Sequence, residues 1–294
     1  MSSSGDTPQI NPSRLQPGQF PSPIVLQPVS SHNLTIIILH GRGFNAQKFH
    51  GPLLSSISTA PSTTLRDSLP HARLVFPTAP LARATKYRRS LIHQWYEGTG
   101  DWEPEARGEM RPSVEHIHGM LRDEIEKLEG DSRKVALMGF SQGGAMTLVS
   151  SLLWDGAPLG AVVVMSGFMP LADAMMDILD EDTKSEGSED DLFERDTEEE
   201  ETTPIQRAID ELRQEAELDP APPANSYPFL STPVFMGHGQ KDQDVECQHG
   251  RRAVELLERM GVPVEFNTYQ GLAHWYNSDM LQDIVQFLDK HLGL

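Results

Sequence analysis

One serine of the chain stands in a setting that suits nucleophilic chemistry. Ser141 occupies the centre of the segment Gly-Phe-Ser-Gln-Gly at positions 139–143, between a β-branched run and a segment of helical periodicity. A sharp strand-to-helix turn of this kind exposes a serine hydroxyl, and the small glycines permit the strained backbone. A free hydroxyl is a poor nucleophile until a base removes its proton. The motif therefore predicts a partner histidine elsewhere in the chain.

The acid and the histidine of such a site should follow the serine, in that order. Asp242 comes just after a strand that we predict at 234–237, and Asp244 is its rival if the turn is longer. His274 follows a strand predicted at 264–269. Because the carboxyl ends of parallel strands share one edge of a sheet, we expect these side chains to meet Ser141. The expected chemistry is acyl transfer from an ester or thioester to serine.

Acyl transfer also requires fixed N–H donors for the oxyanion that forms on the attacked carbonyl. We expect one donor to be the backbone N–H of Gln142, the residue after the serine. The other should come from the turn His-Gly-Arg-Gly at 40–43, where we choose Arg42. The alternative for this turn is an ordinary tight loop, since glycine pairs are common in turns.

Short apolar runs and helix-period segments alternate along the chain, which is typical of parallel strands joined by crossover helices. Together with the serine turn, this pattern predicts the α/β class and an α/β-hydrolase fold, with helices on both faces of a mostly parallel sheet. Ser113, after Pro112, is the expected N-cap of the first clear crossover helix. The predicted strands are 35–39, 73–76, 134–138, 161–165, 234–237 and 264–269, and the predicted helices are 114–128, 143–153, 248–260 and 280–291.

Two segments fall outside that alternation. Residues 1–23 are rich in Ser, Pro and Gln, and we interpret them as a disordered tail before a single domain spanning 24–294. Residues 174–228 interrupt the domain as an acidic, partly disordered insertion. The stretch 173–201 holds 15 acidic residues against two basic ones, so it carries most of the chain's net charge of -19. Its later part, 204–218, has apolar residues at helical spacing and is expected to be an amphipathic helix.

Composition also limits the classes of partner. An acidic chain is repelled by nucleic acid and by anionic membranes, so neither is expected. Cys247 is the only cysteine, which excludes an intrachain disulfide and fits a reducing compartment such as the cytoplasm. The longest apolar runs are too short to cross a bilayer of about 30 Å as helices, so no transmembrane segment is expected. The acidic stretch matches no calcium loop, so no metal site is predicted.

Four motifs together resemble the acyl-protein thioesterase and carboxylesterase family. They are His-Gly-x-Gly from His40, Gly-Phe-Ser-Gln-Gly-Gly from 139, His-Gly-x-x-Asp from His238 and Gly-x-x-His from 271. The segments at 77–80 and 94–97 are similar to further family motifs. The resemblance implies a cofactor-free serine hydrolase acting on acyl groups, including thioester-linked fatty acyl chains on proteins, lysophospholipids and small esters. It implies the triad Ser141, Asp242 and His274, and thereby selects Asp242 over Asp244.

The chain also departs from the family pattern near the expected pocket. Arg42 stands where leucine is typical, Phe44 and Asn45 replace a usual acidic position, and Trp275 follows His274 where serine is common. The insertion is much longer than the usual link between the corresponding strands. Protein deacylation is therefore only one of the activities to expect. Three aromatic residues are candidates for an acyl pocket, although large aromatics are more often core residues: Trp95, Phe168 and Trp275.

Three hypotheses follow for function. The first is an ester or thioester hydrolase. The second is a scaffold on a hydrolase fold, whose acidic insertion binds a basic partner. The third assigns the 204–218 helix as a lid over the pocket, against the alternative of a mobile helix in solvent.

Overall fold

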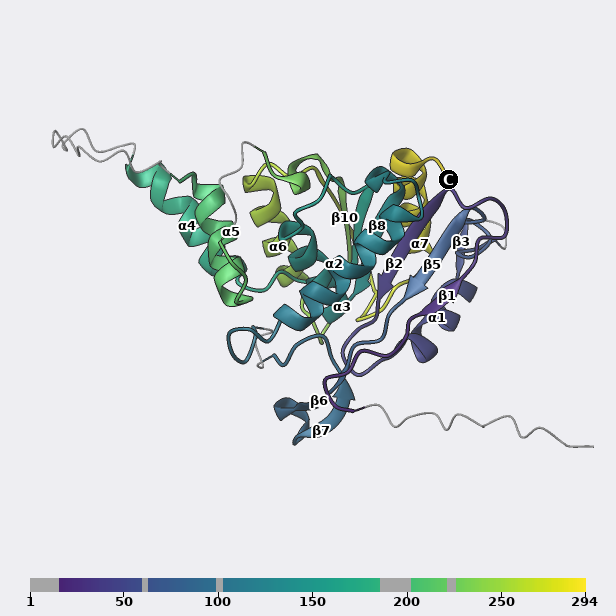
Figure 1. Cartoon of the computed structure of the whole chain (residues 1–294), viewed down its shortest axis with the longest axis horizontal. Coiled ribbons are helices and arrows are strands. Elements are labelled where there is room, and N and C mark those ends of the chain that lie inside the picture. The colour runs from purple at the N-terminus through teal and green to yellow at the C-terminus, as the bar shows by residue number, and fades with distance from the viewer. Residues whose placement is uncertain (1–15, 60–62, 99–102, 186–201, 221–225) are drawn as a thin grey trace, which may run out of the picture.

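A seven-stranded sheet forms the centre of the computed structural model, which describes residues 16–59, 63–98, 103–185, 202–220 and 226–294. Only the edge strand β1 is antiparallel to its neighbour; the other strands run parallel (Figure 1). This arrangement confirms the predicted α/β-hydrolase fold. In spatial order the strands are β1 (Ile24–Leu26), β5 (Ala72–Phe76), β2 (Leu34–Leu39), β8 (Val135–Phe140), β9 (Ala161–Met165), β10 (Val234–Gly239) and β11 (Val264–Tyr269).

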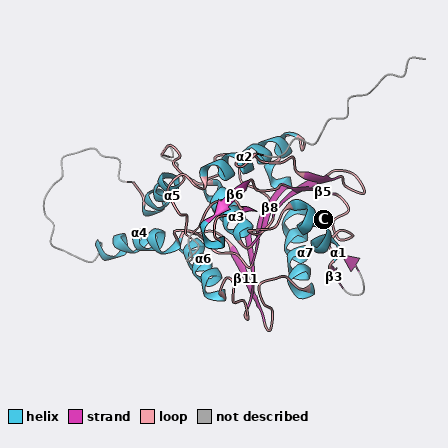
Figure 2. Cartoon of the chain, turned by 90° about the horizontal axis from the view of Figure 1, so that it is seen from below, coloured by secondary structure: helices cyan, strands magenta, loops and turns pink. Residues whose placement is uncertain are grey.

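Helices cover both faces of the sheet because its strands are apolar on both sides. In β2, Ile37 and Leu39 belong to one core cluster, whereas Ile36 and Ile38 belong to the other. This alternation is the two-residue period of an extended strand. One face carries α2 (Arg111–Glu126), α3 (Gln142–Leu152) and α6 (Cys247–Arg259), and the opposite face carries α1 (Ala46–Ser55) and α7 (Ser278–Leu292) (Figures 1 and 2).

The first crossover helix starts earlier than expected. Ser113 is not the N-cap of α2, because the helix begins at Arg111 with Pro112 in its first turn, where the fixed φ of proline suits a helix. The Ser113 hydroxyl instead donates a 2.5 Å hydrogen bond to the carbonyl of Trp95. The serine therefore joins α2 to the segment beside the serine turn.

The described part of the insertion consists of two packed helices, α4 (Ala172–Ser185) and α5 (Pro204–Glu215), which lie side by side at the end of the molecule away from β1 (Figures 1 and 2). The expected insertion begins at 174, inside α4. Met175 and Met176 of this helix are buried in the core, so its acidic residues lie on an amphipathic helix. Residues 186–201 and 221–225 of the predicted insertion lie outside the described residues.

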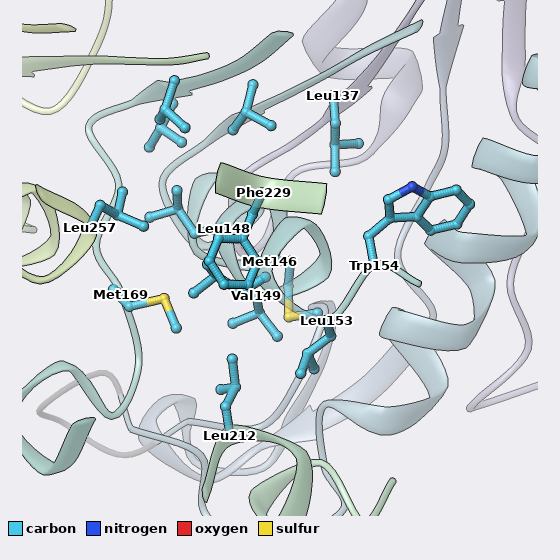
Figure 3. Close-up of a cluster of buried hydrophobic side chains, with 14 of the residues drawn as sticks. Leu137, Met146, Leu148, Val149, Leu153, Trp154, Met169, Leu212, Phe229 and Leu257 are labelled. Atoms are coloured by element: carbon cyan, nitrogen blue, oxygen red, sulfur yellow. The ribbon is translucent and has the colours of Figure 1, made fainter. Parts of the chain in front are cut away.

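The amphipathic helix α5 is neither a helix free in solvent nor a cover for the serine. Its apolar face is buried in the main core, where Leu212 points toward Val149 and Met169 (Figure 3). At its carboxyl end, the carbonyl of Glu215 accepts a hydrogen bond from the N–H of Gly108. The apolar stripe that favoured a lid is thus used in packing against the domain.

The N-terminal segment is described from residue 16, and the rest of the predicted tail, 1–15, lies outside the described residues. The N–H of Gly18 donates to the carbonyl of Leu81, and Phe20 stacks on His116 with 4.0 Å between ring centroids. The last residues of the predicted tail therefore lie against the domain, where Phe20 stacks on the partly buried His116.

Two small hairpins complete the described elements. One joins β3 (Ile57–Thr59) to β4 (Thr63–Thr64), and the other joins β6 (Leu81–Ala84) to β7 (Ser90–His93). The β6–β7 hairpin projects beyond the sheet at the end where the parallel strands finish (Figure 1). Short 3-10 turns occupy 85–87, 132–134 and 228–231. Across the described ranges, none of the helices combines the length and apolar character that a membrane crossing requires.

Candidate active site

The serine turn is strained, and its neighbours leave no room for larger residues. Ser141 has φ 55° and ψ -125°, which is unfavourable for a residue with a side chain. A Cβ at Gly139 would lie 2.2 Å from the carbonyl oxygen of Gly143, and one at Gly143 would lie 2.5 Å from that of His40. Both glycines are needed because β8, α3 and β2 approach so closely here. The N–H of Ser141 donates to the carbonyl of Met165, which fixes the turn against β9.

Three predicted residues from different loops are brought together at this turn. His274 Nε2 lies 2.9 Å from Ser141 Oγ, and His274 Nδ1 lies 2.7 Å from Asp242 Oδ2. An ionised carboxylate only accepts hydrogen bonds, so Nδ1 carries the proton and Nε2 is free to accept the serine proton. The arrangement is a continuous relay of hydrogen bonds from the serine to a carboxylate.

Asp242 is buried, and its loop is organised around its carboxylate. Oδ1 accepts the N–H groups of Asp244 and Val245, at 3.0 and 2.9 Å. Burial alone would raise the Asp242 pKa, but hydrogen bonds from His238, His274 and the Val245 N–H outweigh it and hold the pKa well below its usual range. The Asp244 side chain is exposed, and only the backbone N–H of Asp244 donates to the Asp242 carboxylate. The structure therefore brings Asp242, and not its rival, to His274.

His238 is a neighbour of Asp242 to which sequence reasoning gave no role. Its Nε2 lies 2.9 Å from the carbonyl of Val245 and 3.3 Å from Asp242 Oδ2, so Nε2 carries a proton that both oxygens share. Its Nδ1 is buried and has no hydrogen-bond partner among the residues that the structure describes. The spacing His-Gly-x-x-Asp was the available signal, because it places both residues around one turn after β10.

The turn at 40–43 lies beside the serine, since a Cβ at Gly41 would lie 3.2 Å from Ser141 Cβ. Neither the N–H of Arg42 nor that of Gln142 donates to a protein oxygen within the described part of the chain. The buried His40 ring steadies the turn: Nδ1 donates to the carbonyl of Gly41 at 2.8 Å, and Nε2 accepts the N–H of Ala79 at 3.0 Å. Burial lowers the His40 pKa to about 4, in keeping with a neutral ring whose Nε2 must accept.

Trp95 supports this turn from inside the protein and is not a pocket residue. Its indole N–H donates to the carbonyl of His40 at 2.7 Å, and its backbone N–H donates to Gln142 Oε1 at 3.1 Å. The Gln142 amide also donates to the carbonyl of Tyr96. The side chain of Gln142 thus ties α3 to the 95–96 segment.

A cavity of about 460 Å³ opens at Ser141 and His274. Trp275 lines it, as the aromatic pocket hypothesis expects, and stands 5.7 Å from Phe44 between ring centroids. Phe168 is buried with Ala145 and Val245 and lines a separate cavity of about 220 Å³. The other residues of the serine cavity are Gly41, Arg42, Lys86, Tyr87, Phe140, Gln243 and Asp244.

None of the described insertion residues reaches this cavity. The lid hypothesis for the 204–218 helix is therefore contradicted for the part of the insertion that the structure describes. Among the described residues, no group of three or more His, Cys, Asp or Glu side chains is placed to hold a metal. Around the serine, the described groups in hydrogen-bond contact are a histidine and a carboxylate.

This fold, with a strained serine at the end of a central strand, defines the α/β-hydrolases. The family model described as Phospholipase/Carboxylesterase matches residues 21–190, more than half of the chain. The chain belongs to this family. A second model, that of the prolyl oligopeptidase family, matches residues 121–294, which include the serine turn and the two loops that carry Asp242 and His274.

Relatives with names that describe an activity support the same class. An acyl-protein thioesterase 1 of Gibberella zeae is 25% identical over 92% of this chain and 96% of its own length. One from Debaryomyces hansenii is 26% identical over 73% of this chain and 74% of its own. The protein is accordingly a hydrolase that acts on esters or thioesters.

Solved structures show the same fold. Acyl-protein thioesterase 2 of Zea mays is 21% identical, covers 92% of this chain and 99% of its own, and superposes with a TM-score of 0.63. SOBER1 of Arabidopsis thaliana is 22% identical, covers 88% of this chain and 99% of its own, and has a TM-score of 0.60. At these identities, the likeness is one of fold.

Proposed function

We propose that this protein cleaves carboxylic esters or thioesters through a covalent acyl-enzyme, with Ser141 as nucleophile, His274 as general base and acid, and Asp242 as the residue that orients His274. The observation that carries the proposal is the relay of hydrogen bonds, 2.9 Å from Ser141 to His274 and 2.7 Å from His274 to Asp242. These distances lie within the range for direct proton transfer between the serine and the imidazole.

In the first half of the reaction, Ser141 Oγ attacks the acyl carbonyl as His274 Nε2 takes the hydroxyl proton. The carbonyl π electrons move to the oxygen, and the N–H groups of Arg42 and Gln142 stabilise the resulting oxyanion. The tetrahedral intermediate then collapses, and the bond to the leaving oxygen or sulfur breaks as His274 returns the proton to that atom. An acyl-enzyme and a free alcohol or thiol result.

In the second half, a water molecule takes the place of the leaving group. His274 removes a proton from the water as its oxygen attacks the acyl-enzyme carbonyl, and the same two N–H groups receive the oxyanion. Collapse expels Ser141, which recovers its proton from His274. The products are a carboxylic acid and the regenerated enzyme.

The depressed pKa of Asp242 supports its assigned role. A carboxylate that stays ionised throughout the cycle stabilises the imidazolium formed on His274 and fixes the ring with Nε2 toward the serine. Asp242 itself exchanges no proton with the histidine.

For the substrate, we infer acyl esters and thioesters, with S-acylated proteins as one candidate. This inference comes from the thioesterase names of the relatives and from the aromatic residues Phe44, Phe140 and Trp275 of the serine cavity, which offer apolar contact to an acyl group. The cavity is lined by residues outside the insertion as far as the chain is described.

Fluorophosphonate labelling of the wild type and of Ser141→Ala tests the proposal, followed by hydrolysis of p-nitrophenyl esters and acyl thioesters of increasing chain length. We expect the wild type to be labelled and to hydrolyse both classes, and Ser141→Ala to lose both properties while keeping its circular dichroism spectrum. Equal labelling of the two proteins would place the nucleophile elsewhere. The chain-length profile separates long-chain thioesters from small esters as preferred substrates.

The alternative hypothesis, a scaffold that binds a basic partner through the acidic insertion, gains no support from the family or from the named relatives. No observation on the described residues favours it over hydrolysis.

A further inference from the structure

His238 is a buried histidine beside the triad that the proposed reaction does not yet use. Its side chain is 1% exposed, and it does not line the serine cavity. Its Nε2 lies 2.9 Å from the carbonyl oxygen of Val245 and 3.3 Å from Asp242 Oδ2. Both oxygens only accept hydrogen bonds, so Nε2 carries the proton and offers it to both. The contacts of this ring therefore end on the loop that carries the triad carboxylate.

The ring itself is held by regular secondary structure. His238 lies in β10, where its backbone pairs with Thr268 of β11. Next to Nδ1, α6 approaches so closely that a Cβ at Gly250 would lie 2.5 Å from that nitrogen. A glycine is needed there, because any side chain would overlap the imidazole. The sheet and the helix together fix the direction in which Nε2 points.

Asp242, by contrast, lies in a loop, so its carboxylate has to be held by its neighbours. Oδ1 accepts the N–H groups of Asp244 and Val245, which belong to the same loop. Oδ2 accepts the Nδ1–H of His274, the residue that the carboxylate must orient. Among the contacts that the structure shows for this carboxylate, His238 contributes the one that comes from a strand. It is therefore the contact that can set the position of the loop relative to the sheet.

The same ring links both ends of the 242–245 turn. Val245 donates its N–H to Asp242 Oδ1 and accepts the His238 proton at its carbonyl. The Asp242 side chain has no exposed surface on which water could replace the histidine, so the contact acts in a medium of low polarity. Burial raises the pKa of Asp242, and the contact with His238 is the strongest of those that lower it. A displaced carboxylate would leave the ring of His274 without its orientation.

We propose that His238 is a positioning residue for this reaction: its Nε2–H fixes Asp242 and the Val245 carbonyl against β10, which keeps Asp242 Oδ2 directed at His274 Nδ1. The inference rests on the proposed function and adds a fourth side chain to it. Because His238 does not line the serine cavity, it acts through Asp242 and not on the substrate. Loss of its donor should therefore lower kcat and leave KM nearly unchanged.

Three substitutions at position 238 test the donor. His238→Leu removes it, His238→Asn has an amide that reaches only as far as Nδ1, and His238→Gln has an amide N–H at the reach of Nε2. In the Leu and Asn variants, kcat for a p-nitrophenyl ester should fall about ten- to hundredfold, since hydrogen bonds to charged groups are the stronger class. The Gln variant should keep kcat within about threefold of wild type, and KM should change by less than about threefold in all of them.

His118→Leu is the matched control. His118 is likewise buried, and its Nε2 donates to a backbone carbonyl, that of Ser150, at 2.8 Å, but it lies on α2 and contacts no residue of the triad. Its replacement should lower the urea midpoint and leave kcat within about threefold of wild type. An unchanged kcat in His238→Leu would overturn the proposal, and so would an equal loss of kcat in the Leu and Gln variants.

A double-mutant cycle with Asp242 shows whether the histidine acts through the carboxylate. Asp242→Ala leaves His238 no carboxylate to position, so His238→Leu should then lower kcat by less than about threefold, against about ten- to hundredfold in the wild-type background. Equal factors in the two backgrounds would mean that His238 acts elsewhere, and the proposal would be wrong.

A further measurement does not depend on turnover and also serves if the Leu and Asn variants do not fold. In protein labelled with ¹⁵N-histidine, the chemical shifts of the ring nitrogens report which of them carries the proton, and the signals absent from His238→Gln belong to His238. We expect the proton on Nε2. A proton on Nδ1 would disprove the proposal, since Nε2 could then donate to neither Asp242 nor Val245.

Failure of this inference can be told apart from failure of the proposed function. If Ser141 is labelled by the fluorophosphonate and esters are hydrolysed, but His238→Leu keeps the full kcat, the role of His238 alone is wrong. If Ser141 is not labelled and no ester is cleaved, the proposed function fails, and this inference fails with it.

Discussion

The serine edge of the sheet and the α4–α5 pair are held in place by different forces. At the serine edge, hydrogen bonds fix the side chains of Asp242, His274 and Gln142, and the backbone at Ser141 is strained. The α4–α5 pair is attached by apolar packing and by ion pairs to α6 at the surface. The first region depends on exact placement of polar atoms, whereas the second depends on buried area. Substitutions at the serine edge should therefore mainly lower activity, and substitutions in the α4–α5 pair should mainly lower the free energy of unfolding.

The largest expected effect is the loss of kcat when the Asp242 carboxylate is replaced. Asp242→Asn should lower kcat by about 10³- to 10⁴-fold, because the amide no longer holds His274 with Nε2 free to accept the serine proton. Asp244→Asn should lower kcat by less than about tenfold, since its side chain does not reach His274. Ester hydrolysis at saturating substrate measures both. An equally small loss in the two variants would mean that either aspartate can orient the histidine, and an equally large loss would mean that both are required.

On the insertion side, Leu212→Ala should act on stability. Removing this buried side chain leaves a cavity between α5 and the core and should lower the free energy of unfolding by about 2–5 kcal/mol. The kcat/KM of the folded enzyme should stay within about threefold, because no described residue of α5 reaches the cavity. Urea denaturation followed by circular dichroism measures the first quantity. The control Gln214→Ala, at an exposed position of the same helix, should change stability by less than about 0.5 kcal/mol. A large loss of activity in folded Leu212→Ala would show that the regions are coupled.

As the pH falls, the first loss of folding stability is expected from His40, in the turn beside the serine. The pKa of His40 is lowered to about 4 by burial, whereas the unfolded chain has the ordinary value near 6.5. The unfolded state therefore binds more protons between these values. The resulting stability is fully present above about pH 6.5 and is lost as the pH falls toward 4. Between pH 7 and pH 5 this loss should amount to about 2 kcal/mol.

Urea denaturation at several pH values checks that expectation. The His40→Asn variant should be less stable at neutral pH but should lose about 2 kcal/mol less than the wild type between pH 7 and pH 5. Parallel pH profiles in the two proteins would exclude His40 as the source. Asp242 acts in a different window, because its depressed pKa makes its contribution disappear only below the ordinary carboxyl pKa of about 4.

The smallest effect is expected at the surface of the insertion. The pair between Asp173 and Arg252 joins α4 to α6, and the Asp173 side chain is 85% exposed. Asp173→Asn should lower the free energy of unfolding by less than about 1 kcal/mol, and the difference should shrink in high salt. Denaturation at low and high ionic strength measures it. A salt-independent loss would indicate that the residue contributes through packing.

Chain order and strand ends were sufficient to predict which side chains meet at the serine edge. Strands have a clear two-residue period, and the carboxyl ends of parallel strands share one edge, so Ser141 and His274 could be placed without knowing the loops. The choice between Asp242 and Asp244 needed the family resemblance, because two residues in one loop differ in side-chain direction and not in position along the sheet.

The pocket and the insertion were harder to predict, for separate physical reasons. Trp95 and Phe168 lie in irregular segments, where no period indicates which way a side chain points, and both are buried away from the serine cavity. In α4, a high density of acidic residues concealed the helical spacing of Met175, Met176 and Leu179, whose burial attaches that helix to the domain. His40 and His238 were visible as motif residues, but their ring contacts depend on tertiary packing.

The positive φ of Ser141 also concerns how this sequence can change over generations. A non-glycine residue in such a conformation costs about 1–3 kcal/mol, and a glycine would avoid much of that cost. A mutation to glycine would therefore be favoured by selection for stability and opposed only by selection for the hydroxyl. Position 141 is thus a place where the two kinds of selection act in opposite directions, and a lineage released from the need for hydrolysis has an immediate energetic reason to lose its serine.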